Sequence, residues 1–451
     1  MNQHPMPSLI TSTGYGNTGS SAGTNILEEF ASIKSYKENE FTFAHETDGI
    51  ADLESSFAEG HRLKTDLAVK RFLVLAHQLS SEKHYKYAFN GKFERLAIEY
   101  INSIVKCVWK GWWFRAFETE RLSKKDTFRI KFAGTLFKYL LESLDFDLYE
   151  PDGWTPDYRP VTNEYYSNFL DKNDIHNFID KTKLFTANLL QEAAAGNTYN
   201  YIMLDQAIPP IAVSKYIRYW TNPKVIIVDR DPRDLYVINK ALWGSGYIPS
   251  NTAEQFIAWY GATRQTREAE LGHSSGEMLF LPFESLVYTY DDSLKKIINF
   301  INLSPKDHIH KLQYFNPEIS RKNTLIFPQY PDLAGDVKKI EKQLEKYCYP
   351  FPEKSYKDNA GISRCRLIQD INDKAEFVQY TGRLPSDMEK YTLVIIFRMT
   401  IFSVNLQRAR KRRGVALLKS LMKMAASLPI LPFDYALNLL FFLFQGAKRK
   451  R

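Results

Sequence analysis

Short apolar runs alternate with helix-like patterns along most of the chain. Runs rich in Ile, Leu, Val and Met, bounded by polar or turn-forming residues, predict buried strands. These runs are residues 8–11, "YIML" at 201–204, "KVIIV" at 224–228 and "MLFLPF" at 278–283. Strands that alternate with helices in this order predict an α/β fold, a parallel sheet flanked by helices.

The helix-like segments show apolar residues at intervals of three and four positions. From Thr24 onward, Ile26, Leu27, Phe30 and Ile33 share one helical face. Further helices are predicted for "TKLFTANLLQEAAAG", "PPIAVSKYIRYW" and "ESLVYTYDDSLKKIINFINL". A β-type segment, "EFTFAHETDGIADLE", is predicted to enter a turn at Asp48-Gly49.

A large helical insertion is predicted over about residues 56–195 of the α/β domain. Residues 56–141 are mostly helical in pattern and include the aromatic, basic stretch "KCVWKGWWFRAF". The acidic stretch that follows, "DFDLYEPDGWTPDYRPVTNEYY", is predicted to form irregular surface.

The character of the chain changes after about residue 352. A linker-like "EKSYKDNAG" precedes helical segments with dense basic clusters, "RARKRR" at 408–413 and "AKRKR" at 447–451. We therefore divide the chain into an α/β domain, 1–355, and a basic helical extension, 356–451. The apolar run 435–444 is too short to span a bilayer. Either it lies on an anionic membrane surface between its basic clusters, or it packs on the first domain with its charges solvated.

Charge and composition narrow the classes of partner and compartment. A net charge of +8 and a pI near 9.0 favour an anionic partner, such as a phosphorylated small molecule or a membrane. Nucleic acid is disfavoured because no reader motif is recognisable. Only three cysteines occur, and the N-terminus lacks the pattern of a secretory signal. We expect a reducing, cytoplasmic location, with peripheral attachment to the inner face of the membrane through the extension.

No metal site is expected from the sequence. Asp and Glu do not cluster, and the cysteines have no metal-ligand spacing. His308 and His310, in "DHIHK", are interpreted as surface residues rather than ligands.

The loop "GYGNTGSS", residues 14–21, follows the first predicted strand and precedes a predicted helix. Its glycines are spaced as in a phosphate-binding P-loop, but Ser20 stands where the Walker lysine would be. Backbone N–H groups at a helix N-terminus bind phosphate or sulfate without a lysine, and Thr18, Ser20 and Ser21 add hydroxyl donors. The competing interpretation is a flexible Gly/Ser linker.

Polar residues follow other predicted strands in the same way. Asp205 and Gln206 come directly after "YIML", and Arg230 follows "KVIIV". Ligands of parallel α/β sheets bind beyond the carboxyl ends of the strands, so these residues and the 14–21 loop are expected to share one crevice.

The segment "KVIIVDRDPRD", together with this loop, resembles the PAPS-dependent sulfotransferases, in particular divergent bacterial enzymes that act on glycans. The similarity extends over residues 8–330, of which 56–195 match only as a generic helical segment. It includes "FESLVYTYDDSLKKIINFINL" and "SRKN" at 320–323. It implies a P-loop NTPase-like sulfotransferase fold, with 3′-phosphoadenosine 5′-phosphosulfate (PAPS) as co-substrate and no metal.

The resemblance also assigns roles to residues of this sequence. It implies that the donor is held by the 5′-phosphosulfate loop, by the arginine of "RDPRD" and by a later basic segment. The corresponding residues here are Gly16, Thr18, Gly19, Ser20, Ser21, Arg230, Asn239, Arg321 and Lys322. Asn17 occupies the place of the catalytic lysine or arginine, and Ile238, beside Asn239, occupies that of a serine.

On the acceptor side, Asp205 is expected to be the base or a substrate contact, and Gln206 a partner of acceptor hydroxyls. A purely structural role is also open for Asp205, as the N-cap of the helix "PPIAVSKY". In the same way Arg230 could pair with a neighbouring aspartate, and Arg321 and Lys322 could be solvated surface charges. Glu284 is expected to be structural, buried against Arg233 or a helix N-terminus.

The sequence thus predicts a sulfotransferase that acts on a hydroxyl of a glycan or lipid-linked sugar. A P-loop kinase is disfavoured by the missing lysine and by "RDPRD". A catalytically degenerate nucleotide-binding or scaffold protein remains the competing interpretation, because Asn17 carries no charge.

Overall fold

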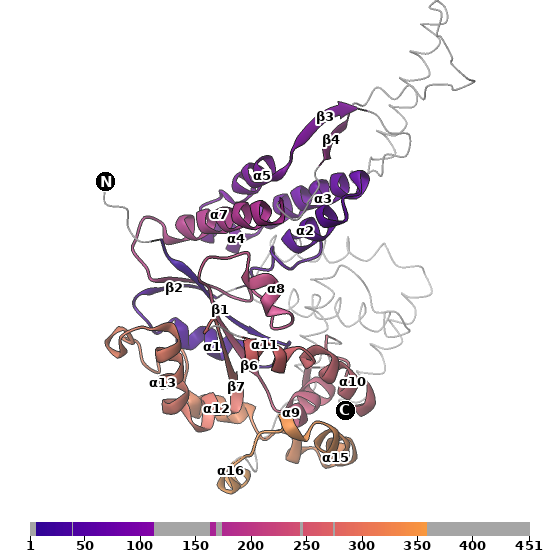
Figure 1. Ribbon diagram of the computed structural model, residues 1–451. Coiled ribbons are helices and arrows are strands. Elements are labelled where there is room, and N and C mark those ends of the chain that lie inside the picture. The colour runs from indigo at the N-terminus through magenta and orange to yellow at the C-terminus, as the bar shows by residue number, and fades with distance from the viewer. Residues whose placement is uncertain are drawn as a thin grey trace, which may run out of the picture. The chain divides into compact units, whose positions relative to one another are not determined.

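A five-stranded parallel sheet organises the larger part of the chain (Figure 1). The computed structural model describes residues 6–37, 39–111, 163–167, 174–243, 247–273 and 276–358. The strands are β1 (Ser8–Gly14), β2 (Ile33–Tyr36), β5 (Tyr201–Leu204), β6 (Lys224–Asp229) and β7 (Met278–Pro282), in the order β2-β5-β1-β6-β7. Since every pairing is parallel, the carboxyl ends of the strands lie along one edge of the sheet. This is the P-loop-like α/β arrangement that the sequence predicted.

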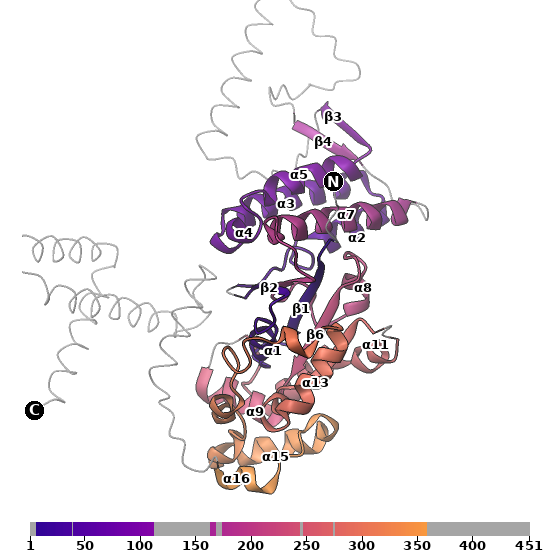
Figure 2. The same cartoon turned by 90° about the vertical axis from the view of Figure 1, so that its left-hand side faces the viewer.

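Alternate residues of the strands face opposite sides of the sheet, and each side has its own core. Leu9, Ile202 and Val225 join an apolar cluster with α2 (Ile50–Glu59), α3 (Arg62–Ser81), α5 (Phe93–Ile104) and α7 (Asp174–Ala194). Ile10, Met203 and Ile226 join another with α1 (Ser20–Leu27), α12 (Phe283–Tyr288) and α13 (Tyr290–Ile301). Helices α3, α5 and α7 lie side by side on the first of these faces (Figure 2).

The helical layer of α2 to α7 is held by aromatic rings and by a charged contact at its border with the sheet. The ring of Phe43 contacts the rings of Phe93 and Phe185. Each aromatic side chain in such a cluster removes a large apolar surface from water. Glu54 is 7% exposed, and its two carboxylate oxygens accept from Nη2 of Arg218 at 2.6 and 2.7 Å. It also accepts the hydroxyl proton of Tyr219. These hydrogen bonds offset part of the cost of burying the Glu54 side chain.

The remaining elements of this unit are short. They are α4 (Lys83–Ala88), the antiparallel pair β3 (Cys107–Gly111) and β4 (Asn163–Ser167), α8 (Val213–Ile217), α11 (Arg267–His273), α14 (Pro317–Ser320) and the 3₁₀ turns Pro305–Asp307 and Arg321–Asn323. The second compact unit comprises residues 233–257 and 325–345 and the chain from 352, where these are described.

The second unit has internal ion pairs and hydrogen bonds of its own. Its elements are most of α9 (Pro232–Val237), the π-helical turn Ile238–Trp243, the start of α10 (Ala253–Arg264), α15 (Ala334–Gln343) and α16 (Glu353–Asp358). Arg233 is 2.6 Å from Glu341, and Tyr236 donates its hydroxyl proton to Asp336 at 2.6 Å. The Asp234 carboxylate accepts the N–H groups of Ile326 and Phe327.

The strand predictions for 8–11, 201–204, 224–228 and 278–283 are confirmed, and several local predictions are wrong. Helix α1 ends at Leu27, and Ile33 begins the edge strand β2. The segment "EFTFA" contains no strand, and "KCVWKG" contains β3 instead of helix. A break at Thr289 divides the predicted 284–303 helix into α12 and α13.

The domain prediction stays a prediction. Helix α16 runs across the predicted boundary after residue 355, and residues 359–451, with both basic clusters, lie outside the described residues. None of the helices described has the length and apolarity needed to cross a bilayer.

Glu29, after helix α1, anchors the segment that leads toward residue 323. Its buried carboxylate accepts the backbone N–H groups of Tyr314 and Phe315, both at 3.1 Å. It also lies 2.6 Å from Nε2 of His308, whose side chain is 4% exposed and stacks on Phe30. His308 is therefore not the surface residue that the sequence predicted, because it serves as a buried partner for this carboxylate.

Glu29→Ala should lower the free energy of unfolding by roughly 2–4 kcal/mol, because it leaves backbone N–H groups and a buried imidazole without an acceptor. Urea titration followed by far-UV circular dichroism measures this change. The control is Glu99→Ala, which removes an exposed α5 carboxylate paired with Arg95 and should cost less than about 0.5 kcal/mol. Equal stability of the two variants would contradict the anchoring role of Glu29.

Candidate active site

The turn between β1 and α1 has the backbone of an anion-binding loop. Gly16, Asn17 and Gly19 have φ values of 92°, 53° and 91°. Successive residues with such dihedrals can direct N–H groups toward a common point. A Cβ on Gly14 would lie 2.2 Å from Oγ1 of Thr18, and one on Gly19 would lie 2.5 Å from the Phe283 ring. The sequence therefore needs glycine at both positions.

Thr18 ties this loop to the neighbouring strand. Its hydroxyl donates to the carbonyl of Val228 in β6 at 2.8 Å, and the residue is 1% exposed. The interpretation of 14–21 as a flexible linker is wrong, because the loop is packed and hydrogen-bonded. Since the hydroxyl proton is engaged, what remains of Thr18 for a ligand is its backbone N–H.

The first turn of α1 suits an anion. Gly19 is the N-cap, and no acidic residue occupies the first turn. Early N–H groups of a helix have no intrahelical acceptor and lie at the positive end of the helix dipole. Ser20 is half-buried and Ser21 is exposed.

Gln206 lies between the end of β1 and the start of α1. Its Oε1 accepts the Thr13 hydroxyl at 2.7 Å and the Gly14 N–H at 3.4 Å. Its Nε2 donates to the Ser20 hydroxyl oxygen at 3.0 Å. Gln206 therefore contacts the loop itself.

Asp205 follows β5 and is linked to α1. Its Oδ1 accepts the hydroxyl of Thr24 at 3.1 Å. Burial raises the pKa of the Asp205 carboxyl to about 7, with a smaller contribution from the nearby Glu40. The interpretation of Asp205 as a helix N-cap is wrong, because α8 begins after Ala212. A carboxyl with a pKa near neutrality can take up and release a proton at physiological pH.

His45 contacts the backbone of Gln206, the residue after Asp205, and sequence reasoning missed it. Its Nε2 donates to the carbonyl of Gln206 at 2.8 Å, which leaves Nδ1 as the acceptor nitrogen of the neutral ring. Burial lowers the pKa of the His45 imidazole. No sequence signal could have found it, because "FAHET" lies in an irregular segment with no motif around it.

Arg230 brings separate segments of the chain together. Its Nη1 donates to the Asn17 carbonyl at 3.3 Å, and its Nη2 donates to the carbonyl of Asn323. The guanidinium carbon lies 4.7 Å from the centroid of the Phe283 ring, and the residue is 6% exposed. The "RDPRD" motif, the 14–21 loop and "SRKN" therefore meet at one side chain.

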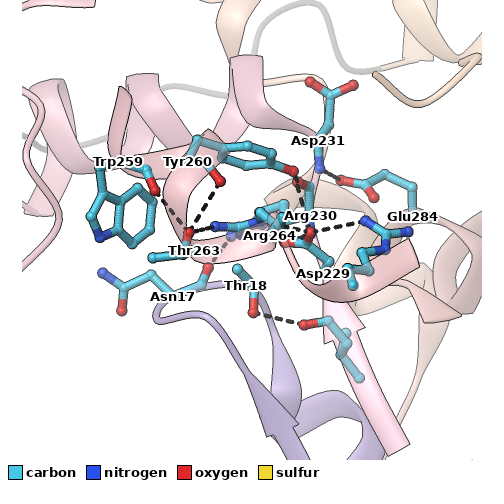
Figure 3. Close-up of polar contacts among 12 residues, drawn as sticks. Asn17, Thr18, Asp229, Arg230, Asp231, Trp259, Tyr260, Thr263, Arg264 and Glu284 are labelled. Carbon is cyan, nitrogen blue, oxygen red and sulfur yellow. Dashed lines mark hydrogen bonds and ion pairs between the residues drawn. The ribbon is translucent and has the colours of Figure 1, made fainter. Parts of the chain in front are cut away.

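A second arginine, Arg264, is fully buried and packs against Tyr15 of the loop, and the sequence did not predict it. Its polar contacts are drawn in Figure 3. Arg264 donates to both carboxylate oxygens of Asp229, at 3.0 and 2.6 Å. Its guanidinium also stacks on the rings of Tyr15 in the loop and Tyr260 in α10, at 4.0 and 3.6 Å. Burial raises the pKa of the Tyr15 hydroxyl, which stays protonated. Arg264 is the last residue of α10, and the polar residues of this helix look like those of an ordinary solvent-exposed helix face. No sequence signal therefore linked Arg264 to the loop.

The remaining predicted donor residues have distinct environments. Arg321 donates to Glu318 at 3.2 Å and Lys322 is exposed, so the contact of this segment with Arg230 is made by the Asn323 backbone. Asn239 belongs to the second compact unit, where its side chain donates to the Leu235 carbonyl at 2.7 Å.

Glu284 has a structural role, as the sequence predicted. It is fully buried at the start of α12, and its Oε1 accepts the N–H of Asp231 at 3.0 Å. This partner is a backbone N–H just ahead of α9.

Within the part of the chain that the structure describes, no group of three or more His, Cys, Asp and Glu could hold a metal ion.

Comparisons with known proteins identify no family for this chain. No family model matches the sequence, and no curated protein matches it either. Among solved structures it is similar to the sulfotransferase STF9 from Mycobacterium avium, with 8% sequence identity and a TM-score of 0.29. That match covers 83% of this chain and 77% of the other chain. At this TM-score the similarity carries no argument, so function has to be inferred from the site residues.

Gly19→Ala should destabilise the loop, because alanine disfavours a φ of 91° and its Cβ would meet the Phe283 ring. We expect a loss of about 1–3 kcal/mol in the free energy of unfolding, measured by urea titration. Gly261→Ala is the control, because no atom lies within 4 Å of its added Cβ in helix α10. It should be neutral or stabilise by up to about 1 kcal/mol. Identical behaviour of the two variants would refute this loop geometry.

Asp205 should make stability fall with rising pH. Its pKa in the folded protein is about 7, above the ordinary value of 3.8, so the folded state binds the proton more tightly than the unfolded state. The stabilisation is complete below about pH 4 and is lost as the pH rises through 7. Asp205→Asn should therefore gain stability relative to the unmodified protein across this window, measured as the urea midpoint from about pH 4 to 8.5.

Asp292→Asn, on the exposed surface of α13, is the control for removing a carboxylate, and its profile should run parallel to that of the unmodified protein. A parallel profile for Asp205→Asn as well would show that burial does not hold the Asp205 proton.

Proposed function

We propose that this chain is a sulfotransferase that moves a sulfuryl group from PAPS to a hydroxyl of an acceptor, a glycan or a lipid-linked sugar. The observation that carries the proposal is Arg230, which touches both the loop after β1, through Asn17, and the 320–323 segment, through Asn323. The resemblance assigned these segments to one donor site although Asn17 and Arg230 are 213 residues apart in the sequence. Their convergence is what a donor with phosphate groups at both its 5′ and 3′ ends requires.

In this proposal the 5′-phosphosulfate lies on the loop and the 3′-phosphate near Arg230. The loop offers the N–H groups of Gly16 to Ser21 and the hydroxyls of Ser20 and Ser21. Arg230 offers a planar guanidinium, which suits bidentate binding of a phosphate. Arg321 and Lys322 add positive charge to the segment that contacts Arg230.

Sulfuryl transfer, by analogy with phosphoryl transfer, needs the entering and leaving oxygens in line and donors for the charge that develops. Asn17 supplies a neutral amide where the family has a lysine or arginine. Arg264 does not supply the positive charge that Asn17 lacks, because its guanidinium is paired with the buried Asp229 carboxylate. Neutralisation therefore falls to Arg230 and to the N–H groups of the loop and helix.

On the acceptor side we propose Asp205 as the general base. Its carboxylate takes the hydroxyl proton while the acceptor oxygen bonds to sulfur, and the bond from sulfur to the leaving phosphate oxygen breaks. Adenosine 3′,5′-bisphosphate leaves. A pKa of about 7 supports this role, since about half of the Asp205 carboxyls are ionised at pH 7. His45 is hydrogen-bonded to the backbone of the adjacent residue, Gln206.

The acceptor class follows from the resemblance to glycan sulfotransferases. We also propose that the basic extension, 356–451, brings the enzyme to the inner face of a membrane, where lipid-linked sugars are found. Its charge supports this placement, and the small number of cysteines supports a cytoplasmic location.

The test is calorimetric titration with adenosine 3′,5′-bisphosphate, compared with AMP and ATP. We expect micromolar binding that needs the 3′-phosphate, and a loss of at least about 30-fold in Arg230→Ala, since a charge-assisted pair with phosphate is removed. Arg95→Ala, at an exposed position on α5, is the control and should bind as the unmodified protein does. A label-transfer screen with PAPS and hydroxylated acceptors then identifies the substrate.

Binding of ATP in preference to the bisphosphate would favour a P-loop kinase. Absence of nucleotide binding would favour a scaffold protein.

A further inference from the structure

The carboxamide of Gln206 has a defined orientation. The Gly14 N–H is a donor only, so the atom that faces it must be the oxygen, Oε1. The Thr13 hydroxyl donates to the same oxygen at 2.7 Å. The amide nitrogen therefore points to the other side, toward the Ser20 hydroxyl, 3.0 Å away.

This orientation decides what the Ser20 hydroxyl does. An amide N–H₂ group can only donate, so the Ser20 oxygen is the acceptor in this contact. The hydroxyl proton of Ser20 then points away from Gln206. Among the described residues no side chain or carbonyl accepts that proton, and Ser20 opens helix α1 beside the loop glycines. Ser20 is left as a donor at the place where an anion is expected.

The backbone of Gln206 is held as firmly as its side chain. The residue has a φ of 55°, which is uncommon for a side chain of this type. Its N–H donates to the Ser12 carbonyl at 3.2 Å, and its carbonyl accepts from His45 at 2.8 Å. Contacts at the backbone and at both ends of the carboxamide leave Gln206 little freedom to turn toward another ligand.

We propose that Gln206 is a positioning residue that orients the Ser20 hydroxyl as a donor to the 5′ anion of the nucleotide. This inference rests on the proposed function and corrects the sequence interpretation of Gln206 as a contact for acceptor hydroxyls. It also gives the lysine-free loop an additional oriented donor. A hydroxyl whose oxygen already accepts a hydrogen bond is the better donor, because bonds in such a chain polarise one another.

The test separates the two ends of the nucleotide. Adenosine 3′,5′-bisphosphate, AMP with its 5′-phosphate and adenosine 3′-monophosphate are titrated into Ser20→Ala, Gln206→Leu and the double variant. Ser20→Ala should weaken binding of the bisphosphate about tenfold and Gln206→Leu about fivefold. In the Ser20→Ala background, Gln206→Leu should cost less than about twofold, because the hydroxyl that it orients is gone. Affinity for adenosine 3′-monophosphate should not change.

Gln206→Glu keeps an oxygen acceptor for Thr13 and Gly14 and removes the donor to Ser20, so it remains informative if Gln206→Leu does not fold. Gln206→Glu should weaken AMP binding more in the protein that has Ser20 than in the Ser20→Ala variant. Repulsion between the new carboxylate and the phosphate is present in both proteins, so the difference between them reports the lost orientation of the Ser20 hydroxyl. Gln78→Glu, exposed on α3, is the control for the added charge and should bind as the unmodified protein does.

The outcomes distinguish this inference from the proposed function. If the unmodified protein shows no preference for the 3′-phosphate, the proposed function fails. If that preference holds but the Ser20 and Gln206 effects are additive, or extend to adenosine 3′-monophosphate, the positioning role of Gln206 is overturned.

Discussion

The parallel pairing of β1 with β5 on one side and β6 on the other is the constraint on which the site depends. It places Gly14, Leu204 and Asp229, the last residues of these strands, at one edge of the sheet. Three parts of the site begin within a few residues of those ends: the loop from Gly14, Asp205 with Gln206, and Arg230. A shift of the register by one residue would turn each strand over and separate these groups, and the apolar cores on both faces oppose such a shift.

The loop is held from several directions by contacts that do not depend on a ligand. Thr18 binds the Val228 carbonyl, Gln206 binds both ends of the loop, and Tyr15 packs on Arg264. The Arg264 guanidinium is held by Asp229 and in turn fixes the Tyr15 ring, which stacks on it. A pre-organised cradle of this kind loses little entropy when an anion binds.

Without the lysine, the loop has to stabilise the negative charge of a bound anion by other means. A lysine brings a mobile point charge, whereas Asn17 brings a neutral amide, and the cation that contacts the loop backbone is Arg230. In the proposed binding mode the positive charge lies toward the 3′-phosphate, and uncharged donors and the helix dipole serve the reacting end. Donors fixed in place can stabilise a transition state without net charge, since they need no reorganisation during the reaction.

The sequence by itself determined the parallel α/β sheet, the positions of β1, β5, β6 and β7, and the convergence of the Gly14 loop, Asp205 and Arg230. Strand periodicity, glycine spacing and the rule that ligands bind at the carboxyl ends of strands can all be read from short stretches of sequence. These local signals were enough to predict the sheet and the segments that meet at its edge. The sequence prediction failed at Ile33, because an apolar side chain suits a helix or a strand equally. Ile33 belongs to an edge strand only because that strand pairs with β5.

Only the tertiary structure decided the partners of the polar groups. His45, Arg264 and Tyr15 came to the site through irregular or unremarkable segments. His308 proved to be buried against Glu29, and the Gln206 carboxamide proved to be hydrogen-bonded to Ser20. A hydrogen bond between residues far apart in the chain leaves no periodic trace in the sequence. Its direction, and the pKa that follows from burial at Asp205, exist only once the segments are packed.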